Sequence, residues 1–341
     1  MSFIKYGSVE EYKIEFDYSS IHILVDSNTK KHCLPKLPAS LTEQANIIIV
    51  KSGEMHKTID SAKMIWEKLS NKNADRKALM ICLGGGMVGD LGGFCAGTYK
   101  RGIKYIQIPT TLLSMVDSSI GNKTGIDLNG IKNLVGLFYP PQVTIIDHRF
   151  LVTLSSRQIL NGYAEIIKHS LIAKEETLFD QIFEKDLLKC EPEKLIPLNI
   201  EIKSQIVDQD PLEQNSRKWL NFGHTVGHAI EAQAMQKGID MLHGEAIIIG
   251  MMIELELSTA KLGFPQDLRN KIIDWIKDNY RIDADWIKSE AKRLLNFMKN
   301  DKKNHEKRTL FSLLKSKGDC IENVECDDKL ILQTLQRHRK W

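Results

Sequence analysis

The sequence has no long apolar run and no apolar segment near its N-terminus. Its longest hydrophobic stretch, residues 246–253, is far shorter than the roughly 18 residues that a membrane-spanning helix needs. The opening residues, MSFIKYGSVEEYK, lack the hydrophobic region of a secretory signal. We therefore expect a cytoplasmic protein without a membrane partner.

Paired cysteines and a large excess of charge are also absent. The six cysteines include no Cys-x-x-Cys pair, which argues against a cysteine zinc site or a disulfide framework and favours reduced thiols. The formal net charge of +3 is too small to indicate a nucleic-acid partner. It leaves room for a local cationic pocket that binds a small anion.

The 341 residues, 42% of them hydrophobic, are enough for about two globular domains. Residues 1–150 alternate apolar runs with helical stretches. The segments that predict strands are residues 21–26, 47–50, 78–84, 105–109 and 143–147, and residues 57–71 predict an amphipathic helix. Several of these runs are apolar on both faces, as in a sheet covered by helices. The first half therefore predicts a Rossmann-like α/β domain with a parallel sheet.

Residues 151–341 have little strand character and predict an α-helical domain that binds metal and substrate. Ser155, followed three residues later by Gln158, is typical of the capping box that begins a helix. Helical periodicity then continues through most of the chain. We expect the active site in the cleft between the two domains, where ligand sites are common.

A glycine-rich turn follows the predicted strand at residues 78–84. Gly84, Gly86 and Gly89 match G-x-G-x-x-G, in which glycines let the backbone approach a pyrophosphate at a helix N-terminus. The acidic residue that usually binds the ribose about 20 residues later is missing. Glycine turns of this kind also exist purely for packing, so the pattern indicates a nucleotide site without proving one.

His224 and His228 lie four residues apart in a predicted helix, the spacing that lets two histidines share a metal. The alternative is that they belong to an ordinary polar face. His243 at the start of another helix, and Glu165 with Lys168 and His169 on a third, favour a metal. Two histidines and one carboxylate leave an open position, which is typical of a catalytic zinc that polarises an alcohol.

Cationic side chains are spread over both halves of the chain. Most such charges in proteins are simply solvated. Lys123 differs because the sequence GNKTGID predicts a turn rather than the flank of a helix. A substrate that carries a phosphate and a carboxylate would need several cations.

The chain resembles the 3-dehydroquinate synthase family of sugar-phosphate cyclases along nearly its whole length. The segments that carry the resemblance are GGGMVGDLGGFCAGTYKRGI, IPTTLLSMVDSSIGNKTGID, NLVGLFYPPQ, GYAEIIKHSLI, LNFGHTVGHAIE, LHGEA and DKK. Their order and number are specific to this group. The resemblance implies NAD and Zn²⁺ as cofactors, with Co²⁺ as an alternative metal.

The resemblance also implies a role for each matching residue. The implied metal ligands are Glu165, His224 and His243, and His228 faces the substrate instead. The implied NAD-contacting residues are Asp26, Asn28, Glu54, Lys57, Gly85, Gly86, Asp90, Thr110, Thr111, Lys132 and Thr153. The implied substrate residues are Asp117, Lys123, Asn133, Lys168, Lys203, Arg217, Asn221 and His228, together with Lys302 or its neighbour Lys303. Arg101 would act across the interface of a homodimer.

The implied reaction is that of a lyase in the shikimate pathway of aromatic amino-acid biosynthesis. 3-Deoxy-D-arabino-heptulosonate 7-phosphate is oxidised at C5 by NAD⁺, which acidifies C6–H and allows phosphate to leave. Hydride then returns to C5, and an intramolecular aldol reaction closes the ring of 3-dehydroquinate. NAD is thus regenerated within each turnover.

Three other functions remain open from the sequence. A related cyclase whose substrate has no carboxylate would have little use for the cations Lys203 and Arg217. A metal-dependent polyol dehydrogenase would release NADH and would not need a set of phosphate-binding residues. A non-catalytic NAD-binding regulator would have no reason to keep the histidine and glutamate cluster.

Overall fold

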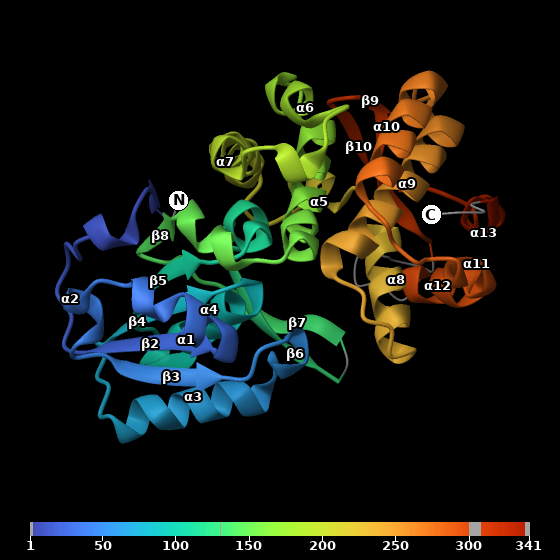
Figure 1. Ribbon diagram of the computed structural model, residues 1–341. Helices are drawn as coiled ribbons and strands as arrows, with labels where there is room; N and C mark the ends of the chain where they lie inside the picture. Colours follow the sequence, from blue (N-terminus) through green and yellow to red (C-terminus); the bar gives the residue numbers. More distant parts are fainter. Residues whose placement is uncertain (1–2, 130, 300–307, 338–341) are drawn as a thin grey trace. The chain divides into compact units, whose positions relative to one another are not determined.

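The computed structural model describes residues 3–129, 131–299 and 308–337 (Figure 1). The chain divides into two compact units, with the boundary between Ile159 and Leu160. The sequence places the division near residue 150.

The N-terminal unit is built on a six-stranded parallel sheet with the strand order β1-β8-β5-β4-β2-β3. The strands are β1 (Phe3–Tyr6), β2 (Ile21–Asp26), β3 (Asn46–Val50), β4 (Leu79–Gly84), β5 (Lys104–Pro109) and β8 (Val143–Ile146). β4 and β8 are buried along their whole length, because helices cover the sheet. The parallel sheet is as predicted, whereas the short edge strand β1 is an addition, since its sequence FIKY has no distinctive pattern.

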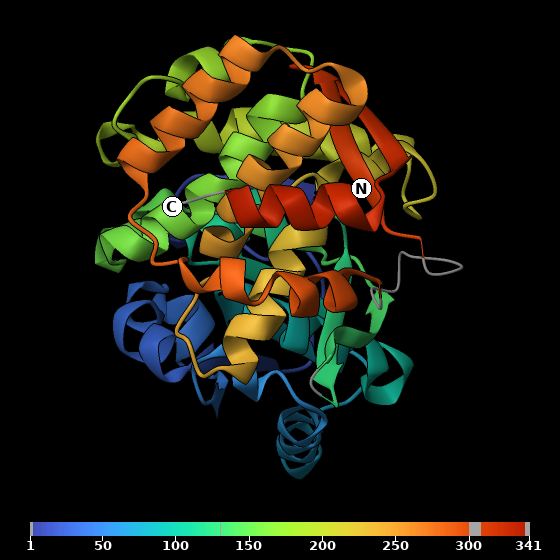
Figure 2. The same cartoon turned by 90° about the vertical axis from the view of Figure 1, so that its right-hand side faces the viewer.

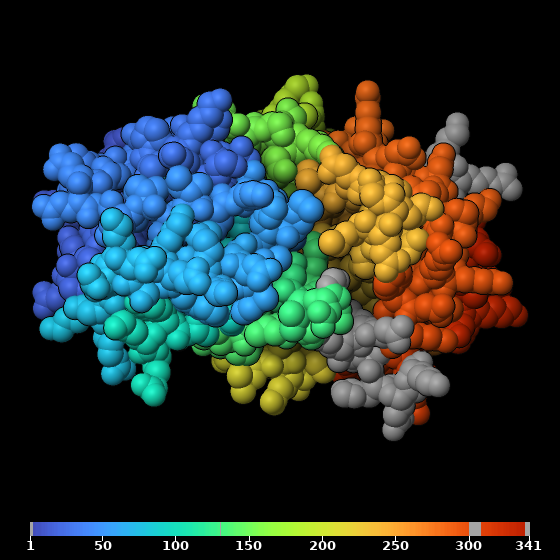
Figure 3. Space-filling model, turned by 90° about the horizontal axis from the view of Figure 1, so that it is seen from below, coloured from blue at the N-terminus to red at the C-terminus, as the bar shows by residue number. Residues whose placement is uncertain are grey.

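Two longer helices, two short helices and several turns complete the described part of this unit. The helices are α1 (Ser27–His32), α2 (Ala39–Thr42), α3 (Ile59–Asn71) and α4 (Gly86–Thr98), and the turns are η1 (Val9–Glu11), η2 (Leu34–Lys36), η3 (Glu54–His56), η4 (Tyr99–Arg101), η5 (Ser114–Ser118, a π-helical turn) and η6 (His148–Thr153). α3 buries Ala62, Ile65 and Leu69 and lies at the surface of the unit (Figure 3). α4 packs so closely on the sheet that a Cβ at Gly89 would lie 2.2 Å from Gln107. Gly89 of the glycine motif therefore serves packing.

An antiparallel hairpin stands where the sequence suggests a loop. β6 (Lys123–Leu128) pairs with β7 (Ile131–Phe138), and Lys123 is the first residue of β6. The expectation of a turn at Lys123 was therefore wrong by one or two residues: the turn ends at Asn122, which has a φ of 60°. β7 has no alternation of buried and exposed residues, which is why periodicity missed it.

The C-terminal unit is helical, as predicted, with one additional hairpin. Its helices are α5 (Ser156–Ile172), α6 (Thr177–Ile182), α7 (Pro192–Gln209), α8 (His224–Gln236), α9 (His243–Leu262), α10 (Gln266–Asn279), α11 (Trp286–Ser289), α12 (Ala291–Lys299) and α13 (Asp328–Arg337), with 3₁₀ turns η7 (Leu187–Lys189) and η8 (Ser216–Asn221). The hairpin joins β9 (Leu310–Ser316) to β10 (Asp319–Glu325) and appears as two red strands in Figure 2. α9 forms the core of the unit, since most of its residues are buried. Within the described ranges, no helix is long and apolar enough to cross a membrane.

Candidate active site

The predicted dinucleotide residues gather at the carboxyl ends of the parallel strands. β2 lies between β3 and β4 in the sheet. The chain passes from β2 to β3 on one side, and then crosses back to β4 and β5 on the other side, so the direction of the connections reverses here. Ligands of open α/β sheets bind at such a switch point. Asp26 ends β2, and Gly85 and Gly86 follow β4 at the start of α4. Thr110 and Thr111 follow β5, the next strand.

Asp26 and Asn28 are held by the cap of α1. The Asp26 carboxylate accepts hydrogen bonds from the backbone N–H groups of Asn28 and Thr29, at 2.8 and 2.7 Å. The Thr29 hydroxyl in turn meets the Asp26 N–H at 2.9 Å, which completes a reciprocal cap. The end of β2 therefore has a fixed conformation.

Lys57 links α4, the helix that follows the glycine-rich turn, to the loop after β3. Its buried ammonium group lies 2.8 Å from Asp90 on α4 and 3.2 Å from Glu54. Burial alone would lower the pKa of Lys57, but the carboxylates of Asp90 and Glu54 raise it above its usual value. Lys57 is therefore charged at neutral pH. Asp90, an unusual residue inside a glycine-rich turn, is explained as the partner of this lysine.

Replacing Lys57 with methionine should lower the free energy of unfolding by about 2 kcal/mol. The change leaves Asp90 and Glu54 close together without a cation. Breaking a buried ion pair usually costs roughly 3–5 kcal/mol of stability. The cost should be smaller here because both carboxylates are partly exposed. Urea unfolding measures the effect. The matched control is Lys63→Met on α3, whose exposed pair with Glu67 spans 3.9 Å and should change stability by less than about 0.5 kcal/mol. Equal losses for both variants would contradict the role of Lys57.

Other predicted residues of this unit lie on three separate turns and strands. Asp117 is in the π-helical turn η5, a type of turn that is frequent at functional sites. Lys132 and Asn133 are on β7, and Thr153 ends η6. Asn133 has a φ of 50°, and its N–H donates to the Asp127 carboxylate at 2.8 Å. The Asp127 N–H donates to the Lys57 carbonyl at 2.7 Å, which ties the hairpin to the Lys57 loop.

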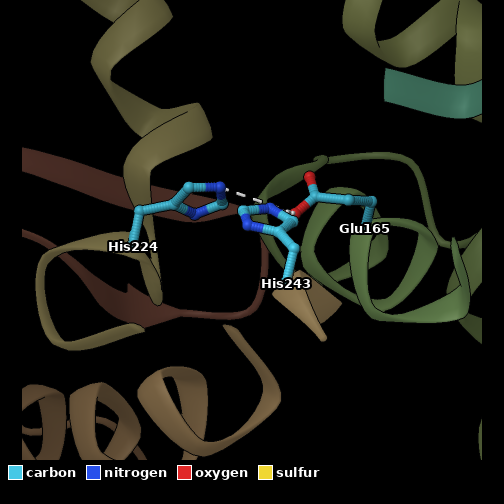
Figure 4. A group of neighbouring side chains, drawn as sticks. All are labelled: Glu165, His224 and His243. Carbon is cyan, nitrogen blue, oxygen red and sulfur yellow. Dashed lines mark ion pairs between the residues drawn. The ribbon is translucent and has the colours of Figure 1, made fainter. Parts of the chain in front are cut away.

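The C-terminal unit brings Glu165, His224 and His243 together (Figure 4). Oε1 of Glu165 lies 3.5 Å from Nε2 of His224 and 3.6 Å from Nε2 of His243. Ligand atoms around a tetrahedral Zn²⁺ are about 3.4 Å apart, given bonds of roughly 2.0–2.1 Å. The donor set and its spacing therefore fit a divalent metal.

The other nitrogen of each histidine is held by the protein. Nδ1 of His224 lies 3.2 Å from the Phe222 carbonyl, which can only accept, so this nitrogen carries the proton and Nε2 is left for a metal. Nδ1 of His243 faces Glu231 at 3.6 Å. Carboxylates and carbonyls behind histidines are the usual second layer of a metal centre. Burial lowers the pKa of His243, but Glu165 and Glu231 outweigh it and raise the pKa to about 10, so a metal would displace a proton there.

His228 lies beside this cluster. Its ring centre is 5.1 Å from that of His224 and 6.1 Å from that of His243. His228, Glu231 and His243 could form a second metal group. That group would use His243 through the nitrogen that faces Glu231, whereas the first group uses the nitrogen that faces Glu165. The first group is favoured because it leaves Glu231 to orient His243.

Four other predicted substrate residues lie in the same unit. Lys168 is buried and pairs with Oε2 of Glu165, one helical turn before it on α5. Lys203 on α7 and Arg217 on η8 are also buried, and α7 packs against η8. Asn221 donates to Glu213 at 2.9 Å. Nδ1 of His169, next to Lys168, is hydrogen-bonded to Oδ1 of Asn199 at 2.9 Å, which links α5 to α7. Lys302 and Lys303 lie outside the described residues.

Sequence reasoning missed the residues that hold the site in place. Asp210 accepts backbone hydrogen bonds from Gln214, Asn215 and Arg217, at 2.9, 2.6 and 3.1 Å, and so shapes the loop that carries Arg217. Burial would raise the pKa of Asp210, but these N–H groups lower it below its usual value. Glu231 could have been found, since it lies seven residues after His224 on one helical face. Asp210 gives no comparable signal.

Comparisons with known proteins cover nearly the whole chain. Family models described as 3-dehydroquinate synthase N-terminal and C-terminal match residues 47–161 and 162–304. A 3-dehydroquinate synthase of Parabacteroides distasonis is 40% identical over 98% of this chain and 95% of its own. One from Streptococcus pyogenes serotype M3 is 37% identical over 92% and 88%. A solved 2-deoxy-scyllo-inosose synthase, complexed with carbaglucose-6-phosphate, NAD⁺ and Co²⁺, has a TM-score of 0.83 at 25% identity, covering 98% of this chain and 96% of its own.

Proposed function

The chain belongs to the 3-dehydroquinate synthase family, and we propose that it converts 3-deoxy-D-arabino-heptulosonate 7-phosphate into 3-dehydroquinate and phosphate. The observation that carries the proposal is the content of the C-terminal unit, which holds a cluster of two histidines and one carboxylate and three buried cations, Lys168, Lys203 and Arg217. The reaction is a step of the shikimate pathway, which supplies aromatic amino acids.

NAD and a divalent metal, Zn²⁺ or Co²⁺, are the cofactors of the proposed enzyme. Glu165, His224 and His243 would hold the metal, and the carboxyl edge of the N-terminal sheet would hold NAD. When bound, the metal would polarise the C5 hydroxyl of the substrate, and NAD⁺ would accept the hydride from carbon C5. The relative of similar fold described above binds both kinds of cofactor.

Separate sets of residues would bind the two charged ends of the substrate. Lys203 and Arg217 suit the carboxylate, because a buried guanidinium can bind it through two parallel N–H bonds. Lys123, Asn133, Lys168 and His228 would bind the phosphate and stabilise the charge that develops as it leaves. Asp117 would orient hydroxyl groups near the nicotinamide. The substrate phosphate itself would accept the C6 proton as it departs.

The same residues argue against the other functions. A cyclase whose substrate lacks a carboxylate would have little use for the two buried cations Lys203 and Arg217. A polyol dehydrogenase would need the metal cluster but not the cations Lys168, Lys203 and Arg217. A non-catalytic NAD-binding protein would need neither the metal cluster nor these cations.

The proposal includes a homodimer in which Arg101 completes the phosphate site of the second subunit. Arg101 is exposed, and both it and Lys100 have positive φ values, 66° and 49°. Such backbone costs about 1 kcal/mol or more per residue and persists only where the surrounding structure holds it, which is frequent at ligand sites. We also place the enzyme in the cytoplasm, where its six free thiols would stay reduced.

Incubation with the heptulosonate phosphate and NAD⁺ should release phosphate without accumulation of NADH. The cofactor is reduced and reoxidised within one turnover, so absorbance at the wavelength of NADH should stay nearly flat while phosphate rises. NADH formed in proportion to substrate would instead indicate a polyol dehydrogenase. Phosphate release from a heptulose phosphate lacking the carboxylate, at an equal rate, would indicate another cyclase.

A further inference from the structure

The first turn of α8, which carries His224, is capped by a buried carboxylate from another helix. We propose that Glu254 is a positioning residue of the metal centre, because it fixes the N-terminus of α8 and with it His224. The proposal rests on the metal centre proposed above. It concerns how this chain builds that centre, since Glu254 lies outside the ligand set.

Two backbone N–H groups of α8 point to this carboxylate. The N–H of Gly223 donates to Oε2 of Glu254 at 2.6 Å, and the N–H of Val226 donates to Oε1 at 3.1 Å. The first N–H groups of a helix have no partner within it and usually bind a side chain at the cap. Gly223 is the cap residue of α8 and has no side chain to offer. Glu254, fully buried, supplies the missing acceptor and places a negative charge at the positive end of the helix.

Glu254 belongs to α9, the helix that begins with His243. About three helical turns separate the two residues. A single rigid helix therefore carries one proposed ligand at its start and holds the helix of another ligand further along. Asn161 of α5 accepts from the N–H of Gly244 at 2.6 Å, so the start of α9 is tied in turn to the helix of Glu165.

The backbones of α8 and α9 touch where Glu254 acts. A Cβ at Gly250 would lie 2.0 Å from the Gly223 carbonyl, and one at Gly227 would lie 2.7 Å from the Ile247 side chain. Gly223 itself has a φ of 82°, which glycine adopts without strain. Close contact sets the distance between the helices, and the two hydrogen bonds set the position of the first turn of α8 along α9.

A metal centre is sensitive to such positioning. Ligand atoms must lie within about 0.2 Å of their required distances, and loss of an outer carboxylate typically weakens metal binding 10- to 100-fold. Glutamine at position 254 has the size of glutamate, but its NH₂ group cannot accept from an N–H. Glu254→Gln would therefore lose one of the two bonds and turn a donor toward a donor.

The chain offers a matched control at the opposite end of α8. Glu290 accepts from Gln233 at 3.2 Å and from Lys237 at 2.8 Å, so it holds the C-terminal end of the same helix, far from His224. Glu290→Gln removes a comparable carboxylate contact. If Glu254 only stabilised α8, the two variants would behave alike.

The experiment measures Zn²⁺ affinity by competition with a chromophoric chelator, the visible absorption of the Co²⁺ form, and the thermal unfolding of the metal-free protein. Glu254→Gln should bind Zn²⁺ at least 10-fold more weakly than the wild type and shift the Co²⁺ bands, whereas Glu290→Gln should keep both wild-type values. Wild-type Zn²⁺ affinity and Co²⁺ bands in Glu254→Gln, with only a lower melting temperature, would overturn the proposal.

If Glu254→Gln does not fold, Glu254→Asp decides the question. Aspartate keeps the charge but is one methylene shorter, so it cannot reach both N–H groups unless α8 moves. Altered Co²⁺ bands in this variant support a positioning role, and unchanged bands overturn it. A wild-type protein that binds no metal would instead refute the metal centre itself, a result separate from any effect of Glu254.

Discussion

Alanine in place of His228 should leave the bound metal in place and reduce turnover by about 10³-fold. Alanine in place of His224 should release the metal and abolish activity. The two histidines are four residues apart on α8. Nε2 of His224 lies 3.5 Å from Oε1 of Glu165, and the Phe222 carbonyl fixes the other nitrogen of His224. Loss of a charge-stabilising group in the reaction corresponds to roughly 3–4 kcal/mol of barrier, which gives the factor for His228.

The measurement is metal content after dialysis, paired with the rate of phosphate release. Glu165→Ala and His243→Ala should behave like His224→Ala, because all three donors are needed at spacings near 3.5 Å. Added Zn²⁺ should restore the activity of chelator-treated wild type but not of these variants. Metal retained in His243→Ala and lost in His228→Ala would show that the i, i+4 pair binds the metal, as the spacing alone suggests.

Local patterns predicted the fold where hydrophobic periodicity is strong. The apolar runs that became β2, β4, β5 and β8 are the interior of a covered sheet, and burial on both faces leaves an unmistakable pattern. The hairpins β6–β7 and β9–β10 were missed. β7 is largely exposed, so no burial pattern could mark it, and β10 pairs with β9 through two register shifts that break its alternation.

The residues of the candidate site also fall into those that the sequence predicted and those that it did not. Residue types and family resemblance pointed to Glu165, His224 and His243, and the structure brings these three together. Glu254 could not be predicted, because its contacts depend on the packing of α8 against α9. Asp210 acts within its own loop, where no periodic pattern marks it. A sequence pattern records neighbours along the chain, whereas a cap supplied from 28 residues away depends on tertiary structure.

The family resemblance implies that Arg101 acts on the site of a second subunit, and we propose this role for it. It ends η4 in a left-handed conformation, with Gly102 following at a φ of 111°. Within the described part of the chain, no acidic side chain pairs with its guanidinium. An exposed arginine held in a strained turn is suited to binding a phosphate through two N–H bonds.

Arg101→Ala and Lys123→Ala should each lose at least about 10²-fold of activity alone, but their mixture should regain part of it. If each site takes Arg101 from one subunit and Lys123 from the other, a mixed dimer has one site with both lesions and one with neither. In a statistical mixture about half of the dimers are mixed, so up to about a quarter of wild-type activity should return after reversible dissociation and reassociation. Lys100→Ala, an exposed cation on the same turn, is the control and should keep full activity. A mixture that stays inactive, with mixed dimers demonstrated by distinguishable tags, would mean that Arg101 serves its own subunit.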